Sequence, residues 1–301
     1  MSRPMARLAF TKMHGCGNDY VYVVSDRHRP ADPAELARRV SDRHFGIGGD
    51  GLIMLVPSRS ADVKMEMYNA DGSRGEMCGN GIRCVARLHY ERTANRKNPI
   101  AIETDCGLKI VELKLEAGRV TGATVDMGEP ILEGRNIPVA TTGSVIARPL
   151  EIAGRSWPIT AVSMGNPHCA TFVDDDAIFA MGDSEFAVLG RQFEHHPFFP
   201  QRVNTEFILM LARDRMRMRV WERGSGETLA CGTGACASLV AAVLTGRANR
   251  RATVELRGGN LEIEWREHGE GANHIFMTGE AVTVFTGEVE VGEDALIPVQ
   301  A

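Results

Sequence analysis

The sequence predicts an α+β protein made of two structurally similar α/β halves. Two segments, 62–69 and 215–222, alternate polar and apolar residues with period two, which is typical of strands with one buried face. Each strand is followed by a glycine-rich turn, a cysteine and a helical stretch. The sequences GEMCGNGIRC and ETLACGTGAC show this repeat most clearly, with Cys78 and Cys231 separated by 153 residues.

The remaining elements follow from periodicity and from helix-start signals. An early helix is expected over 33–43, because Asp32 is a suitable N-cap and proline occupies the first helical position. The other expected elements are helices over 79–94, 184–194 and 232–248, and alternating strand segments over 108–116 and 252–265.

The repeat also predicts the domain organisation. An offset of 153 residues superimposes residues 64–69 on 217–222, so the two strands alternate in phase. Self-similarity at half the chain length indicates two copies of one supersecondary unit. We therefore expect a domain over 1–122 that carries Cys78 and is completed by the C-terminal tail, about 280–301, and a domain over 123–279 that carries Cys231. An internal pseudo-two-fold axis would relate them, with the active site in the cleft between them.

Composition excludes several classes of function. The formal net charge is −5 and the 34 Lys and Arg residues are scattered, which argues against a nucleic-acid partner. No window approaches 18 consecutive apolar residues, and the first ten residues carry charges where a signal peptide needs an apolar stretch. We predict a cytoplasmic protein with no membrane contact. Seven cysteines, an odd number, favour reduced thiols over a disulfide framework.

The two repeated cysteines stand where a thiol gains reactivity. The first turn of a helix has unpaired N–H groups and the positive end of the helix dipole, which stabilise a thiolate. Neighbouring glycines let an anionic ligand approach the backbone closely. Two such thiols on opposite sides of one carbon atom could invert its configuration, one removing a proton and the other returning one. This chemistry needs no organic cofactor, and we expect none.

Several motifs together resemble those of the diaminopimelate epimerase family. They are KMHGCGNDYVYV, YNADGSRGEMCGNGIRC, MGNPH, RVNTEF and VWERGSGETLACGTGACAS, and they follow the family's order over nearly the whole chain. The resemblance implies two similar α/β domains with the active site between them. It also implies interconversion of LL- and meso-2,6-diaminopimelate without pyridoxal phosphate, in lysine and peptidoglycan-precursor synthesis, by a homodimer.

The resemblance assigns roles to individual residues. Cys78 and Cys231 would be the acid and base, and His168 and Glu222 would tune them. The substrate-binding residues it implies are Asn18, Asn69, Asn166, Asn204, Glu222 and Arg223, chiefly for the distal end, and Gly79, Asn80, Gly232 and Thr233 for the reacting carboxylate.

The chain departs from the family pattern at several positions. Gly51 stands where some members carry a glutamine that contacts substrate, so that hydrogen bond is missing here. Cys16 and Tyr20 replace the usual Leu and Phe, which we expect to affect packing only. Phe285 replaces a tyrosine that some members place at the dimer interface.

Competing interpretations are weaker. The sequence GIGGDG at 46–51 matches a dinucleotide-binding fingerprint, but the strand-like run LIMLVP follows it where a helix is required. The cysteine pairs are too widely spaced for a zinc site, so no metal is expected. A metal or redox protein using paired thiols, and another racemase of the same fold such as a proline racemase or a histidine epimerase, remain as alternatives. The other five cysteines are expected to be small buried hydrophobes: Cys16, Cys84, Cys106, Cys169 and Cys236.

Overall fold

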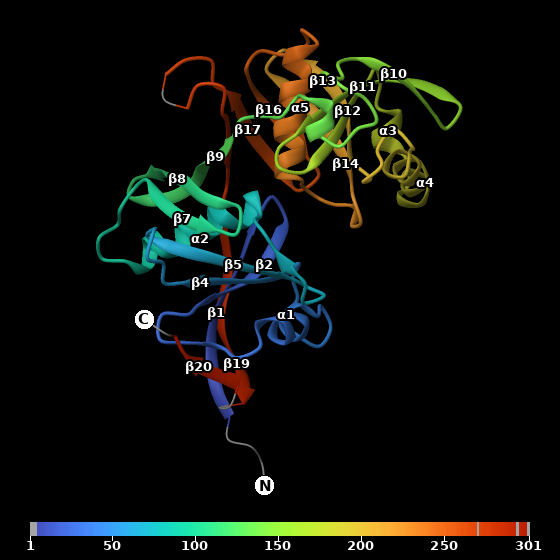
Figure 1. Cartoon of the computed structure of the whole chain (residues 1–301). Helices are drawn as coiled ribbons and strands as arrows, with labels where there is room; N and C mark the ends of the chain where they lie inside the picture. Colours follow the sequence, from blue (N-terminus) through green and yellow to red (C-terminus); the bar gives the residue numbers. More distant parts are fainter. Residues whose placement is uncertain (1–4, 270, 293–294, 300–301) are drawn as a thin grey trace. The chain divides into compact units, whose positions relative to one another are not determined.

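The computed structural model describes residues 5–269, 271–292 and 295–299, and these divide into two compact units (Figure 1). The first unit contains the described residues up to Val125 together with those from Gly279 onward. The second unit is Asp126–Thr278.

The first unit is a mixed sheet with one helix on each face. Its strands, in the order in which they pair, are β19 (Val282–Gly292), β1 (Met5–Gly15), β2 (Asn18–Val24), β4 (Gly51–Val56), β5 (Val63–Asn69), β7 (Ile100–Thr104), β8 (Gly107–Glu116) and β9 (Arg119–Gly128). The β2–β4 and β5–β7 pairs are parallel and the others are antiparallel. The helices are α1 (Pro33–Ser41) and α2 (Gly79–Arg92), and the short strands are β3 (His28–Pro30), β6 (Arg74–Gly75) and β20 (Leu296–Pro298).

The second unit repeats this order. Its strands are β10 (Arg148–Ile152), β11 (Arg155–Ser163), β12 (Pro167–Val173), β13 (Asn204–Ala212), β14 (Arg215–Glu222), β16 (Arg251–Leu256), β17 (Gly259–Trp265) and β18 (Ile275–Gly279), with the β12–β13 and β14–β16 pairs parallel. The helices are α3 (Ala177–Ala180), α4 (Asp183–Glu194) and α5 (Gly232–Leu244), accompanied by the short strand β15 (Gly226–Glu227) and the 3-10 turn η1 (Gly134–Asn136). The predicted α/β fold with two similar halves is confirmed.

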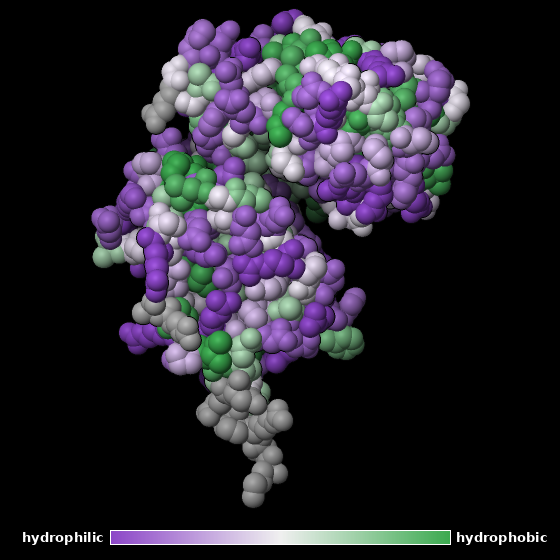
Figure 2. All heavy atoms as spheres, viewed as in Figure 1, coloured by the Kyte–Doolittle hydropathy of each residue, from purple (hydrophilic) through white to green (hydrophobic). Residues whose placement is uncertain are grey.

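Alternation along the strands explains why helices cover both faces of each sheet. In the first unit Leu52, Met54 and Val56 pack in one cluster with α1, whereas Ile53 points to α2. In the second unit Phe207 packs with α4, and its neighbour Glu206 lies against α5. Most apolar side chains are enclosed in these layers, so the face in Figure 2 is mainly hydrophilic in both units.

The predicted helices form, and their ends have local causes. Asp32 caps α1 by accepting a hydrogen bond from the Glu35 N–H. The helix predicted over 79–94 ends at Arg92, because Thr93 adopts an extended conformation. The one predicted over 232–248 ends at Leu244, just before Gly246 with φ of +71°. None of the helices in the described part of the chain is long and apolar enough to span a membrane.

Candidate active site

Cys78 is the N-cap of α2 and lies among amide groups. Its Sγ accepts a hydrogen bond from the Gly81 N–H at 3.3 Å, and its thiol donates to Asn18 Oδ1 at 3.1 Å. Asn80 Nδ2 also donates to Asn18 Oδ1, at 3.5 Å. The half-buried thiol therefore stands at the positive end of a 14-residue helix, in the environment that the sequence predicts.

Asn18 is held in place by an acidic residue. Its Nδ2 donates to Asp50 Oδ2 at 2.7 Å, and the same oxygen accepts from the Asp19 N–H at 3.1 Å. Arg43 donates to the other oxygen of Asp50 at 2.9 Å. Because the Asn18 amide nitrogen is engaged in this way, its carbonyl oxygen is directed to Cys78.

Arg83, in the first turns of α2, holds the start of this helix in place and is fully buried. Its guanidinium donates to Asn80 Oδ1, to the Gly79 carbonyl and to the Glu280 carbonyl, at 3.0–3.1 Å. A buried guanidinium with several acceptors is a rigid anchor. The Asn80 side chain therefore has a defined orientation toward Asn18.

The departures near Cys78 have physical explanations. A Cβ at Gly51 would lie 2.1 Å from the Tyr68 carbonyl oxygen and 2.9 Å from Tyr20 Cε1, so this backbone has no room for a side chain there. Tyr20 does more than pack, because its hydroxyl interacts electrostatically with Cys78 and Asp50. Burial, Cys78 and Asp50 raise the pKa of Tyr20 well above its usual value, which keeps its hydroxyl protonated.

The Asn69 side chain makes its hydrogen bond within the turn that follows β5. Asn69 ends β5 opposite Gly51, and its Nδ2 donates to Ser73 Oγ at 2.9 Å within the following turn.

Cys231 is the N-cap of α5 and is more enclosed than Cys78. It is buried, and its Sγ lies 3.5 Å from Thr233 Oγ1. Burial, followed by the nearby Glu222 and Glu206, raises the pKa of Cys231 well above its usual value, against the opposing effects of Thr233 and the Gly234 N–H. Its surroundings therefore favour the thiol form, so the stabilised thiolate expected from the helix start is wrong for Cys231, because burial and the two carboxylates outweigh the helix end.

His168 and Glu206 form a fully buried pair on adjacent parallel strands. His168 Nδ1 is 2.7 Å from Glu206 Oε1, and His168 Nε2 is 3.0 Å from Asn166 Oδ1. Contacts at both ring nitrogens fix the orientation of the imidazole.

Asn204 and Glu222 connect the ends of neighbouring segments. Asn204 Nδ2 donates to the Pro167 carbonyl at 2.7 Å, and its Oδ1 accepts from the Arg223 N–H at 2.9 Å. Glu222 Oε1 accepts a short hydrogen bond from the Thr228 hydroxyl. The Arg223 side chain donates from Nη1 to the Gln201 carbonyl at 3.2 Å.

The structure thus brings the predicted residues into two groups, one in each unit. Sequence reasoning missed four residues that hold these groups in place: Asp50, Arg83, Glu206 and Thr228. A signal for Glu206 was present, because the 153-residue offset aligns it with Ile53 in the apolar run LIML. Of the other cysteines, Cys16, Cys84, Cys169 and Cys236 are buried as expected. The expectation for Cys106 is wrong: it is exposed in the turn after β7, and its thiol donates to Glu76 Oε2 at 3.4 Å.

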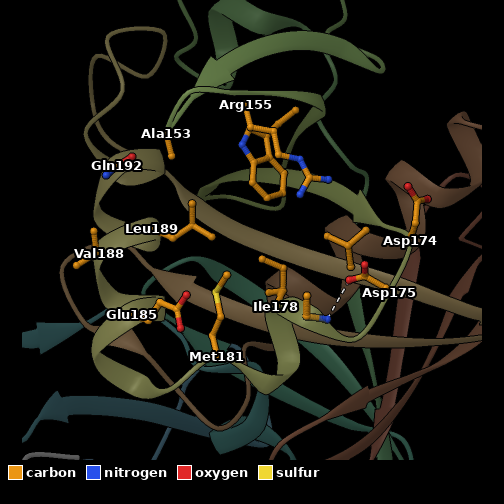
Figure 3. A pocket seen from close by; sticks show the side chains of 13 residues that line it. Ala153, Arg155, Asp174, Asp175, Ile178, Met181, Glu185, Val188, Leu189 and Gln192 are labelled. Carbon is orange, nitrogen blue, oxygen red and sulfur yellow. Dashed lines mark hydrogen bonds between the residues drawn. The ribbon is translucent and has the colours of Figure 1, made fainter.

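A separate pocket of about 520 Å³ lies in the second unit between β11, α3 and α4 (Figure 3). Its lining includes Trp157, Ile178, Met181 and Leu189 on the apolar side, and Glu185 at the rim. None of the predicted site residues lines it. Within residues 5–269, 271–292 and 295–299, no cluster of three or more His, Cys, Asp or Glu side chains is arranged to hold a metal ion.

Comparisons with known proteins agree with the division of the chain into two halves. The family model described as diaminopimelate epimerase matches residues 10–133 and 160–284. A diaminopimelate epimerase of Desulfovibrio desulfuricans is 54% identical over 288 residues, covering 93% of this chain and 98% of the relative. One of Acetivibrio thermocellus is 51% identical over 287 residues, covering 95% and 100%.

Solved structures extend the likeness in fold. A probable proline racemase of Agrobacterium radiobacter K84 has a TM-score of 0.63 at 17% identity, covering 94% of this chain and 92% of that one. A hydroxyproline epimerase of Agrobacterium vitis has a TM-score of 0.64 at 14% identity, covering 97% and 93%. These distant structures share the fold alone, whereas the family model matches both halves. The chain belongs to the diaminopimelate epimerase family, which makes it an isomerase.

Proposed function

We propose that this chain interconverts LL- and meso-2,6-diaminopimelate with Cys78 and Cys231 as its two bases. The observation that carries the proposal is the repetition of one arrangement: each cysteine is the N-cap of the helix that follows the corresponding strand of its unit. Close full-length relatives named diaminopimelate epimerase support the substrate. The proposal requires both half-sites to act on the same α-carbon.

The proposed reaction moves two protons. One cysteine, as thiolate, takes the α-proton, and the electron pair of the broken C–H bond delocalises into the adjacent carboxylate. The other cysteine, as thiol, donates its proton to the opposite face of the carbon. Each turnover exchanges the protonation states of the two cysteines, and the configuration at one α-carbon is inverted.

Charge that develops on the reacting carboxylate needs donors at fixed positions. The first turns of α2 and α5 offer backbone N–H groups at Gly79, Asn80, Gly232 and Thr233, and each carries the positive end of a helix dipole. We assign these groups to the reacting carboxylate. Donors that are already in place stabilise the carbanion without reorganisation during the step.

The distal amino-acid group of the substrate requires polar partners of its own. We assign it Asn18, Asn69, Asn166, Asn204, Glu222 and Arg223. Buried polar groups reject analogues that leave them unpaired by about 10⁴-fold or more. Diaminopimelate should therefore be preferred over lysine by orders of magnitude in kcat/KM.

The test is an assay of the purified chain in D₂O, without added pyridoxal phosphate, against LL-diaminopimelate, lysine, proline and histidine. Two fixed bases predict deuterium at the α-carbon of the product and almost none in recovered substrate during early turnover. Cys78→Ala and Cys231→Ala should each lose at least about 10²-fold in epimerisation. Equal early labelling of both isomers, or an active variant lacking either thiol, would refute the two-base mechanism.

We also propose that the active species is a homodimer in the cytoplasm. Phe285, which the family resemblance associates with the dimer interface, is 46% exposed and packs edge-on against Phe10 at a centroid distance of 5.8 Å. An exposed aromatic ring on a sheet surface is available for such a contact. Sedimentation analysis of wild type and Phe285→Glu should show a dimer for the first and a larger monomer fraction for the second. A monomeric wild type would contradict the dimer.

A further inference from the structure

Glu206 occupies a position that the internal repeat shows to be structurally replaceable. In the second unit, a Cβ added at Gly234 of α5 would lie 2.7 Å from Glu206 Oε1. In the first unit, a Cβ added at the corresponding Gly81 of α2 would lie 2.6 Å from Ile53 Cδ1. Ile53 and Glu206 therefore fill corresponding spaces in the two units, Ile53 next to the start of α2 and Glu206 next to the start of α5. The first unit fills this space with an apolar side chain, so the fold does not need a carboxylate there.

The Glu206 side chain destabilises the folded protein at its buried position. Glu206 is fully buried, and its Oε2 has no hydrogen-bond partner among the described residues. Burial raises the pKa of Glu206, even though the adjacent His168 acts in the opposite direction. Buried polar atoms without partners are rare in proteins because each one loses its hydration. A chain that keeps glutamate where isoleucine would fit is retaining it for its chemistry.

The contacts of Glu206 indicate what that chemistry is. Its Oε1 lies 2.7 Å from His168 Nδ1. The Cβ position at Gly234 lies 2.7 Å from this oxygen and 3.3 Å from Cys231 Sγ, so the oxygen and the sulfur are at most 6.0 Å apart. Glu206 thus lies between the imidazole and the start of α5. In the first unit, the residue that pairs with β4 as His168 pairs with β13 is Tyr20.

We propose that Glu206 is a positioning residue for the epimerisation: it fixes the His168 ring and proton and thereby sets the surroundings of Cys231. This inference rests on the proposed two-base function. The carboxylate accepts the Nδ1 proton, so the tautomer and the ring orientation are fixed before substrate binds. A carboxylate that orients a histidine in this way has large effects on turnover without touching the reacting atoms.

The kinetic test uses Glu206→Ile, which installs the side chain found at the corresponding place in the first unit. We expect kcat to fall at least about ten-fold with KM changed less than about three-fold. Thr205→Val is the matched control at the preceding residue of the same strand: it keeps the β-branched shape and removes a buried hydroxyl that has no hydrogen-bond partner among the described residues. Its kcat should stay within about two-fold of wild type. A Glu206→Ile enzyme with the kcat of wild type would overturn the proposal.

A double-mutant cycle separates positioning from a general structural role. If Glu206 acts through His168, the variant Glu206→Ile/His168→Asn should lose no more than about two-fold relative to His168→Asn alone. Losses that multiply would mean that Glu206 acts independently of the histidine, and would contradict the inference.

A spectroscopic measurement does not depend on activity. In ¹⁵N-histidine-labelled protein, the His168 resonances, assigned by their absence in His168→Asn, should show a protonated Nδ1 in wild type. Glu206→Ile should lose that protected Nδ1 proton, and Thr205→Val should keep it. An unchanged His168 spectrum in Glu206→Ile would refute the positioning role. Absence of wild-type epimerisation with a changed spectrum would instead remove the proposed function and leave the contact itself standing.

Discussion

A methyl group added at the third residue of α2 and of α5 should affect the two units unequally. In Gly234→Ala the new Cβ would lie 2.7 Å from Glu206 Oε1, and in Gly81→Ala it would lie 2.6 Å from Ile53 Cδ1. Ordinary contacts begin at 3.4 Å, so the neighbouring atoms must move by roughly 0.7–0.8 Å. Ile53 can move its terminal methyl by rotation about χ2. A movement of 0.7 Å can stretch the 2.7 Å contact of Glu206 with His168 to about 3.4 Å, which is longer than a strong hydrogen bond of about 2.7–3.2 Å.

The magnitudes follow from these two responses. Loss of a hydrogen bond to a charged group costs about 1.5–3 kcal/mol, and alanine in place of glycine in a helix returns at most about 1 kcal/mol. Gly234→Ala should therefore destabilise the protein by about 1–2 kcal/mol. Gly81→Ala should lie within about 1 kcal/mol of wild type, because rotation of Ile53 and helix propensity nearly cancel.

Urea unfolding of the two variants, with kcat measured on the same preparations, tests the argument. We expect Gly234→Ala to lose about ten-fold in kcat, since the His168 ring is released, and Gly81→Ala to lose less than about three-fold. Equal stability losses in the two variants would show that Glu206 is as free to move as Ile53. That result would refute the reasoning.

Two further predictions concern the individual half-sites. Asp50→Ala should lower kcat by about ten-fold in a steady-state assay. The Asn18 amide would lose its 2.7 Å acceptor and would no longer present its oxygen to Cys78. A wild-type kcat in this variant would contradict the role of Asp50. Iodoacetamide should modify Cys231 slowly at pH 7 and faster as the pH rises, because only the thiolate reacts and the pKa of this thiol is raised. Diaminopimelate should protect Cys231 from the reagent. Peptide mass mapping that shows a pH-independent rate of modification would contradict the thiol state of Cys231.

Local patterns in the sequence were sufficient to predict the elements that carry the two cysteines. Helix-start signals and strand alternation depend on residues within about 15 positions of one another, and the corresponding helices and strands form where expected. The positions of Cys78 and Cys231 as N-caps follow directly from these signals. Helix ends were predicted less well, because Thr93 and the glycine at 246 end the helices before their composition changes.

Contacts between distant segments could not be predicted in the same way. Glu206 and His168 are 38 residues apart and meet only because β12 and β13 pair in parallel with His168 opposite Asn204. Nothing in the local sequence specifies that register. The lack of space at Gly51 likewise depends on the Tyr68 carbonyl across an antiparallel pair. Residues that position others therefore became visible only in three dimensions.

The differences between the repeated half-sites bear on how one cysteine can act as a base while the other acts as an acid. A two-base epimerase needs one thiolate and one thiol at the start of each turnover, and two cysteines in equivalent surroundings would have no preference for either arrangement. The repeat is broken where such a preference can arise. The 153-residue offset places Asn69 at the position of Glu222 and Ile53 at that of Glu206, so two carboxylates surround Cys231 and neutral side chains take their places near Cys78. Negative charge next to a buried thiol favours its protonated form. The two carboxylates of the second half therefore favour the thiol form of Cys231.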